Sequence, residues 1–119
     1  MASRKQIERI EAALGAGDIQ GALRLCEARL RRRPGDKTIA LLQGRALLAA
    51  GKFQAVVDRL AALTAQSKPP VDAILMQALA LIQLERPEPA YDLVKSGLEA
   101  YPAHGELLQY AGLLADQLT

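Results

Sequence analysis

The sequence has very few aromatic residues: one Phe, three Tyr and no Trp, which together make up 3% of its 119 residues. Hydrophobic residues nevertheless account for half of the chain. A core must therefore be built from Leu, Ala, Ile and Val. Ala and Leu are strong helix formers, so this composition favours closely packed helices. A single domain of this length buries roughly two-thirds of the surface that its unfolded chain exposes.

Cysteine and histidine occur only once each. The lone Cys26 excludes an internal disulfide, and we interpret it as a buried thiol on the inner face of a helix. His104 lies in the turn 102–105 with no Cys or paired carboxylate at metal-ligand spacing, and we interpret it as a solvated loop residue. No glycine-rich phosphate loop or nucleophile motif is present. We therefore predict no enzymatic activity, no metal and no cofactor.

Long apolar runs and a strong charge are also missing. No run approaches the roughly 18 apolar residues needed to cross a bilayer, and the charged start of the chain is unlike a signal peptide. The net charge of +2 is too small to indicate nucleic acid or an anionic membrane. Arg29 and Arg31–Arg33 form a basic cluster. We favour cations that complement a helix C-terminus over an anion or nucleic-acid contact, because no aromatic residues interleave for base stacking. We expect a cytoplasmic protein that neither binds nucleic acid nor inserts into a membrane.

Apolar residues at helical spacing, separated by turn residues, predict seven helices. They cover about residues 3–16, 18–33, 36–50, 53–66, 71–84, 87–100 and 105–118. Ser3, Asp18 and Asp36 are expected N-caps, because their side chains can accept hydrogen bonds from the first backbone N–H groups of a helix. The helix over 71–84 is apolar almost all round, so we expect it to be sandwiched between neighbours.

A period of 34 residues is the strongest signal in the chain. The turn Gly17–Ala22 recurs as Gly51–Val56, and 34 residues later a different turn follows at Glu85–Ala90. Pro34 and Pro102 are two periods apart. Other positions recur in columns, among them Ala22, Val56 and Ala90, and a mostly small column of Ile10, Gly44, Ala78 and Gly112. A fixed period of this length indicates a helical repeat.

The residues that best define these repeats are Gly17, Ala22 and Pro34 in the first, Gly44, Gly51, Phe53, Leu60 and Leu63 in the second, and Ala78, Leu81, Ala90 and Pro102 in the third. With them, the whole chain resembles the tetratricopeptide repeat (TPR) family. The resemblance implies an all-α fold, a right-handed superhelical α-solenoid of antiparallel helix hairpins. Residues 1–119 would form one domain, with repeats over about 3–36, 37–70 and 71–104 and a capping helix over about 105–118. The large aromatic that the family favours early in each first helix is replaced by Gln6, Ala40 and Ile74.

In this family the first helix of each hairpin lines a concave groove that holds a peptide or helix of a partner protein. By the resemblance, the groove positions are Ile7, Glu11, Leu14, Leu41, Arg45, Leu48, Leu75, Leu79 and Ile82, with Gln109 and Leu113 as candidate additions from the last helix. Members that grip a C-terminal carboxylate use Lys, Asn and Arg at positions that here hold Ile7, Glu11, Leu42 and Met76, so that clamp is missing. An apolar groove with one central cation, Arg45, favours an amphipathic helix or a hydrophobic extended segment.

The resemblance implies a protein-interaction scaffold or adaptor. A narrower version is a small bacterial chaperone, because compact three-repeat members of the family shield helical export substrates. One alternative is a targeting domain, N-terminal or internal, of a larger multidomain enzyme. Another is a self-associating assembly module that forms a homo-oligomer. For the groove itself, the competing interpretation is that Leu41, Leu75 and Leu79 pack between adjacent first helices as core.

Overall fold

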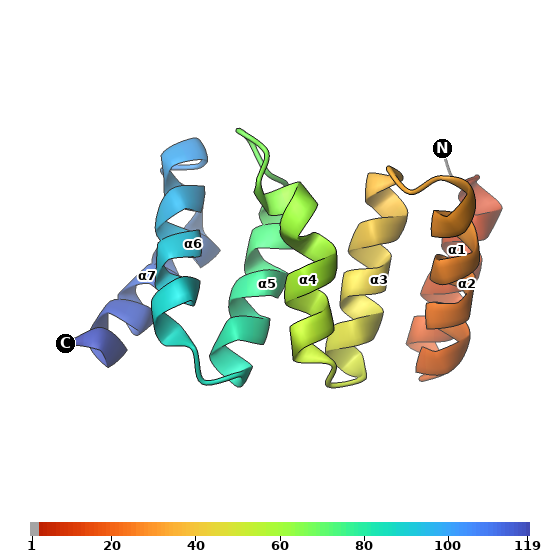
Figure 1. The fold of residues 1–119 in the computed structure, drawn as a ribbon, viewed down its shortest axis with the longest axis horizontal. Helices are drawn as coiled ribbons and strands as arrows, with labels where there is room; N and C mark the ends of the chain where they lie inside the picture. Colours follow the sequence, from red (N-terminus) through yellow and green to blue (C-terminus); the bar gives the residue numbers. More distant parts are fainter. Residues whose placement is uncertain (1–2) are drawn as a thin grey trace. The chain divides into compact units, whose positions relative to one another are not determined.

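The computed structural model describes residues 3–119, and these residues form seven α-helices and no strand (Figure 1). The helices are α1 (Arg4–Gly15), α2 (Ile19–Arg32), α3 (Lys37–Ala49), α4 (Phe53–Thr64), α5 (Val71–Gln83), α6 (Pro87–Ala100) and α7 (Gly105–Leu118). All seven predicted helices are confirmed, with ends that differ from the prediction by no more than two residues. The all-α prediction is therefore correct.

The chain divides into two compact units. The first ends at Lys52 and contains α1, α2 and α3; the second begins at Phe53 and contains α4 to α7. In the first unit α2 packs against both α1 and α3, and α1 also contacts α3. In the second unit each helix packs against the next one along the chain. The boundary lies at the turn between α3 and α4, inside the middle predicted repeat.

The three predicted N-caps are confirmed. The Ser3 hydroxyl accepts a hydrogen bond from the backbone N–H of Gln6, whose side chain accepts one from the Ser3 N–H in return, a complete capping box. The Asp18 carboxylate accepts from Gly21 N–H at 2.9 Å and starts α2. The Asp36 carboxylate accepts from the Ile39 N–H at 3.2 Å and starts α3. Each cap satisfies a backbone donor that the helix leaves without a partner.

His104 lies in the turn before α7 as expected, but it is half-buried and serves as an N-cap. Its side chain is half-buried, and its Nδ1 accepts a hydrogen bond from the Leu107 N–H at 3.4 Å at the start of α7. The reason lies in the repeat: His104 is two periods after Asp36 and does the same work for α7 that Asp36 does for α3. An imidazole nitrogen can take that role because it is an acceptor when it carries no proton.

The first helix of each predicted repeat ends in the same way. After α1, α3 and α5 the chain turns through one residue in the left-handed conformation: Gly17 at φ 79°, Gly51 at φ 73° and Glu85 at φ 59°. In each case this residue and the next donate two backbone hydrogen bonds to carbonyls of the last helical turn, the Schellman arrangement. The bonds run from Gly17 to Leu14, Asp18 to Ala13, Gly51 to Leu48, Lys52 to Leu47, Glu85 to Ile82 and Arg86 to Leu81.

A second type of helix end also recurs, two periods apart. Arg33 ends α2 with φ −136° and ψ 83°, and Tyr101 ends α6 with φ −133° and ψ 69°, in each case one residue before a proline. The backbone N–H of Asp36 then donates to the Arg33 carbonyl, and that of His104 donates to the Tyr101 carbonyl. The 34-residue period of the sequence is therefore a period of backbone geometry as well.

Small and branched apolar side chains form the core of the first unit. Its fully buried members come from all three helices and are Ile10, Ala22, Cys26, Ile39, Leu42 and Ala46. The predicted burial of Cys26 is confirmed: none of its side chain is exposed. Burial removes the thiolate from water and raises the pKa of this thiol to about 11.

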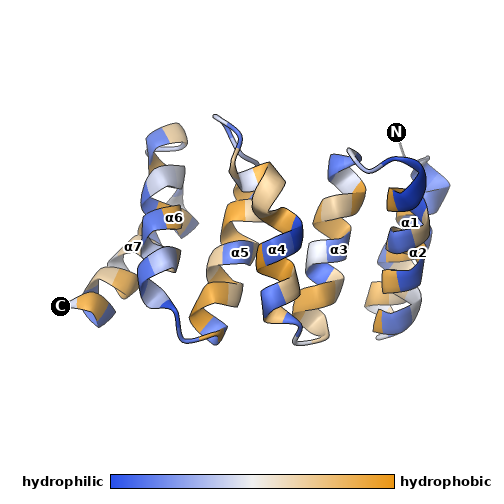
Figure 2. Cartoon of the chain, viewed as in Figure 1, coloured by the Kyte–Doolittle hydropathy of each residue, from blue (hydrophilic) through white to orange (hydrophobic). Residues whose placement is uncertain are grey.

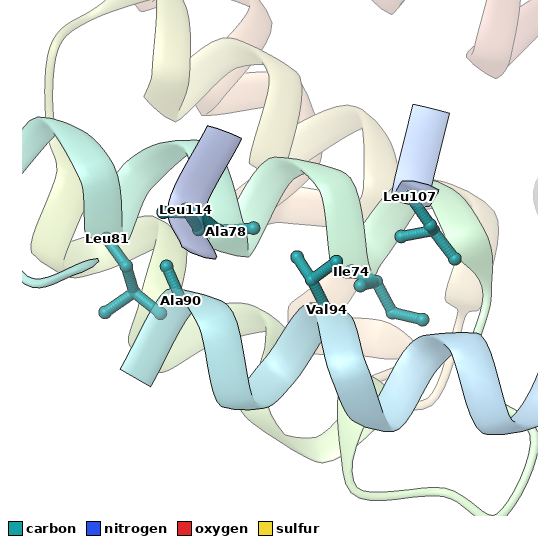
Figure 3. Packing of buried hydrophobic residues seen from close by; sticks show 7 residues of the cluster. All are labelled: Ile74, Ala78, Leu81, Ala90, Val94, Leu107 and Leu114. Carbon is teal, nitrogen blue, oxygen red and sulfur yellow. The ribbon is translucent and has the colours of Figure 1, made fainter. Parts of the chain in front are cut away.

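The core of the second unit joins α5, α6 and α7 (Figure 3). Its buried members are Ile74, Ala78, Leu81, Ala90, Val94, Leu107 and Leu114. Seven of the thirteen residues of α5 are buried, and α5 packs between α4 and α6, as its all-round apolar character predicts. The buried Gln77 side chain donates a 2.8 Å hydrogen bond to the Val57 carbonyl of α4, which satisfies a polar group inside this contact.

Gly97 sets the distance between α6 and α5. A Cβ atom added to Gly97 would lie 3.0 Å from Cδ1 of Ile74 and 3.3 Å from its Cγ2. The Ile74 side chain occupies the space that a side chain at position 97 would need, and Ile74 is fully buried there.

The loop between α4 and α5 is held by Tyr101 at the end of α6. The Tyr101 hydroxyl donates a 2.7 Å hydrogen bond to the carbonyl of Pro69, which is itself buried. The ammonium group of Lys68 lies 5.6 Å from the centre of the Tyr101 ring, within the range of a cation–π contact. The Tyr101 side chain therefore connects the α4–α5 loop to the C-terminal end of α6.

Candidate interaction surfaces

Six of the nine predicted groove residues lie on two helices of the first unit that contact each other. Ile7, Glu11 and Leu14 follow one another along one face of α1 at a spacing of four and three residues. Their counterparts one period later, on α3, are Leu41, Arg45 and Leu48. The four apolar side chains are half-buried, and the two charged ones are exposed. We call these six residues the first-helix face of unit 1.

The remaining three predicted groove residues, Leu75, Leu79 and Ile82, lie on α5 in the second unit, and all three are half-buried. Leu75 and Ile82 also pack against the core of that unit. Ile7 and Leu14 do the same in the first unit. These four side chains therefore contribute to the core with one side and leave another side exposed, so the groove and core interpretations each describe part of them.

Two of the four positions compared above with a carboxylate clamp, Leu42 and Met76, are buried here. Leu42 is 5% exposed and Met76 is 9% exposed, so each presents little surface to a partner. In the first unit Leu42 is part of the central core cluster. Lysine or asparagine at such buried positions would lose its hydration without gaining a partner.

A hollow of about 310 Å³ between α1 and α2 was not predicted from the sequence. We call it the α1–α2 hollow. Its lining combines apolar carbon with three guanidinium groups and contains no carboxylate: Gln6, Arg9, Ile10, Leu25, Ala28, Arg29 and Arg32. In Figure 2 the two helices that form it carry both hydrophilic and hydrophobic colours. The Arg29 Nε lies 3.7 Å from the Asp36 Oδ2, which holds Arg29 toward α3.

The repeat explains why this hollow is open. Arg9 of α1 corresponds to Gln43 of α3 and Gln77 of α5, and both glutamines are buried. Gln77 is covered by α4, to whose backbone it donates. On α1 the corresponding face carries the exposed Arg9 instead. Knowing which helix lacks a neighbour requires the folded arrangement, and the only sequence signal is the change from Gln to Arg in this column.

A second hollow, of about 550 Å³, lies at the turn between α2 and α3 and is lined by Arg33, Gly35, Asp36, Lys37 and Thr38. Asp36 already caps α3 and pairs with Arg29. Arg31, Arg32 and Arg33 are exposed around the last turn of α2, where cations oppose the negative end of the helix dipole. Their predicted position at a helix C-terminus is confirmed.

The side chains that could support chemistry are few and separated. Among residues 3–119 no group of three or more His, Cys, Asp or Glu could hold a metal ion. The Cys26 thiol is buried and, with a pKa of about 11, protonated at neutral pH. Within the same part of the chain no helix has both the length and the apolar character needed to cross a membrane.

Comparison with protein-family models and with curated proteins gave no match to this chain. Two surfaces of the protein are therefore the basis for inferring its function. One is the predicted first-helix face, which the structure leaves half-exposed at every apolar position. The other is the α1–α2 hollow, which combines an apolar floor with positive charge.

Proposed function

We propose that this chain is a TPR-type helical repeat protein that binds a peptide or an amphipathic helix of a partner protein and has no catalytic role of its own. The observation that carries the proposal is that half-exposed apolar side chains recur on α1, α3 and α5 at equivalent positions, one 34-residue period apart. A narrower form of the proposal is a small chaperone that shields a helical segment of its client.

The exposure of these positions supports binding over a purely structural role. A residue needed only for the core tends to be fully buried, as Ile39 and Ile74 are on the same helices. Leu41 and Leu79 instead keep part of their apolar surface in contact with water. Covering such surface with a partner's apolar side chains yields about 25 cal/mol per Å².

Charge in the middle of the first-helix face favours a particular register for the bound segment. Glu11 of α1 and Arg45 of α3 are exposed at equivalent positions with opposite charges. A partner helix with apolar residues at helical spacing and a basic and an acidic residue at its polar edges would complement both. Such charges contribute more to specificity and orientation than to affinity.

The proposal is tested by selecting peptides from a displayed library on the immobilised protein and measuring their affinity by calorimetry. Leu41→Glu and Leu79→Glu should each weaken binding of the selected peptides by about tenfold or more, because each places a charge in an apolar contact. Ala62→Glu, at an exposed position of α4, is the matched control and should bind normally. Helical circular dichroism must be unchanged in all three variants. A selection that yields no peptide, or full affinity in both groove variants, would contradict the proposal.

A further inference from the structure

Large hydrophobic side chains are exposed at only two places in the described part of the chain. One is Leu25, 37% exposed, in the lining of the α1–α2 hollow. The other is helix α7, where Leu108 is 51%, Leu113 63% and Leu118 38% exposed. Exposed apolar side chains that gather at a few places mark interaction surfaces more often than single scattered ones do.

The two places also carry opposite charge. Residues 1–52 contain eleven Lys or Arg and five Asp or Glu, a net charge of +6; residues 53–119 contain four and eight, a net charge of −4. The α1–α2 hollow has three arginines and no acidic residue in its lining. Helix α7 has two acidic residues, Glu106 and Asp116, and neither Lys nor Arg.

Helix α7 has an open face that is covered in its counterpart. Leu108 and Gly112 correspond to Ile74 and Ala78 of α5, which are fully buried in the core that α5 shares with α6 and α7 (Figure 3). On α7 both positions are exposed, and a Cβ added to Gly112 would meet no atom within 4 Å. With no side chain at Gly112, the backbone of another helix can approach α7 closely.

We propose that α7 of one copy of this chain docks in the α1–α2 hollow of a second copy, head to tail. Leu108 and Leu113, at the two edges of the exposed face of α7, would contact Leu25 and Ala28 from either side, which replaces water on these apolar side chains. Asp116, near the negative C-terminal end of α7, would lie toward the exposed guanidinium groups of Arg9 and Arg32.

This contact joins two different surfaces, so a pair of copies leaves one of each surface unoccupied. The pair still presents one free hollow and one free α7, so a further copy can add at either of these surfaces. Association should therefore rise steadily with protein concentration. It should fall with added salt, because exposed opposite charges contribute to it. These surfaces are separate from the first-helix face, so the inference does not rest on the proposed peptide binding.

The test uses two double variants with all changes at exposed positions. The hollow variant carries Arg9→Glu and Arg32→Glu, and the α7 variant carries Leu108→Asp and Leu113→Asp. In sedimentation velocity, the average mass of the unaltered protein should rise with concentration, and each variant alone should stay at the mass of a monomer. An equimolar mixture of the two variants should form a dimer and stop there, because α7 of the first still fits the hollow of the second.

Three results would overturn the inference: a monomeric unaltered protein at every concentration, association of either variant alone, or a mixture that stays monomeric while both variants retain helical circular dichroism. Arg9→Lys with Arg32→Lys keeps the charges and should keep the association. If the α7 double variant loses helix, the single change Asp116→Arg replaces it with the same expected loss. Leu41→Glu should leave association unchanged, which separates this test from that of peptide binding.

Discussion

At the scale of single residues, Glu85 stands out because it adopts a backbone conformation that its side chain disfavours. Its φ of 59° lies in the left-handed region, where the two equivalent turns use Gly17 and Gly51. A residue with a Cβ in this conformation costs about 1–2 kcal/mol relative to its right-handed form. The hydrogen bonds of the Schellman arrangement around Glu85 hold it there nonetheless.

This comparison yields a pair of opposite predictions. Glu85→Gly should raise the free energy of unfolding by about 0.5–1 kcal/mol, because relief of the strain outweighs the greater chain entropy of glycine. Gly51→Ala should lower it by about 1 kcal/mol, because alanine would enter the same strained region. Urea unfolding followed by circular dichroism measures both. A Glu85→Gly protein no more stable than the original would show that Glu85 gains a compensating contact.

The buried thiol of Cys26 gives a prediction about pH. Its pKa is about 11 in the folded protein and 9.0 for an ordinary thiol, so between these values the unfolded chain binds fewer protons than the folded one. The contribution of the Cys26 thiol to the free energy of unfolding is therefore fully present below about pH 9, and it is lost as the pH rises toward 11.

Two measurements check this. A thiol reagent at neutral pH should react with Cys26 far more slowly in the native protein than in urea. Unfolding free energies measured between pH 8 and 10.5 should fall more steeply for the original protein than for Cys26→Ala, which lacks the titrating group. Parallel pH curves for the two proteins would contradict the assigned cause.

At the scale of secondary-structure elements, the contact between α5 and α6 depends on one missing side chain. Gly97→Ala should lower the free energy of unfolding by about 1–2 kcal/mol, because its Cβ would force Ile74 out of its place. Gly112→Ala is the matched control: its Cβ meets nothing within 4 Å, so better helix propensity should stabilise the protein by up to about 1 kcal/mol. Adding Ile74→Val to Gly97→Ala should recover part of the loss. Equal effects of the two alanines would argue against packing as the cause.

The elements themselves could be predicted because their ends are encoded locally. Asp18 and Asp36 each cap a helix within three residues of their own position, and Gly17 and Gly51 end the preceding helices without help from distant residues. The capping role of His104 was not predicted, because nothing in its immediate sequence marks a cap; only its position two periods after Asp36 does. In a repeated sequence, the equivalent position one or two periods away can therefore be more informative than the residues next to it in the chain.

The candidate surfaces were predictable only in part, for a different reason. The first-helix positions follow from the repeat, and the structure leaves their apolar members half-exposed. The α1–α2 hollow and the open face of α7 depend instead on which helices have no neighbour on one side, as the contrast between the exposed Arg9 and the buried Gln77 shows. That information belongs to the packing of the chain and to no single segment of it.

At the scale of the whole molecule, the division into two units coincides with a division of charge. The basic unit ends at Lys52 and the acidic unit begins at Phe53, although the total charge is only +2. A small net charge therefore conceals two larger ones of opposite sign. This separation of charge is what the proposed docking between two copies of the chain requires.

The Tyr101 side chain that fastens the α4–α5 loop has a spectroscopic consequence as well. All four aromatic residues of the chain, Phe53, Tyr91, Tyr101 and Tyr110, belong to the second unit, and there is no Trp. Tyrosine fluorescence therefore reports on the second unit alone, and Tyr101, whose hydroxyl is bonded to the Pro69 carbonyl, changes its surroundings when that loop comes free. The far-ultraviolet signal reports on the helices of both units. Tyrosine fluorescence can therefore follow the unfolding of the second unit without an added label.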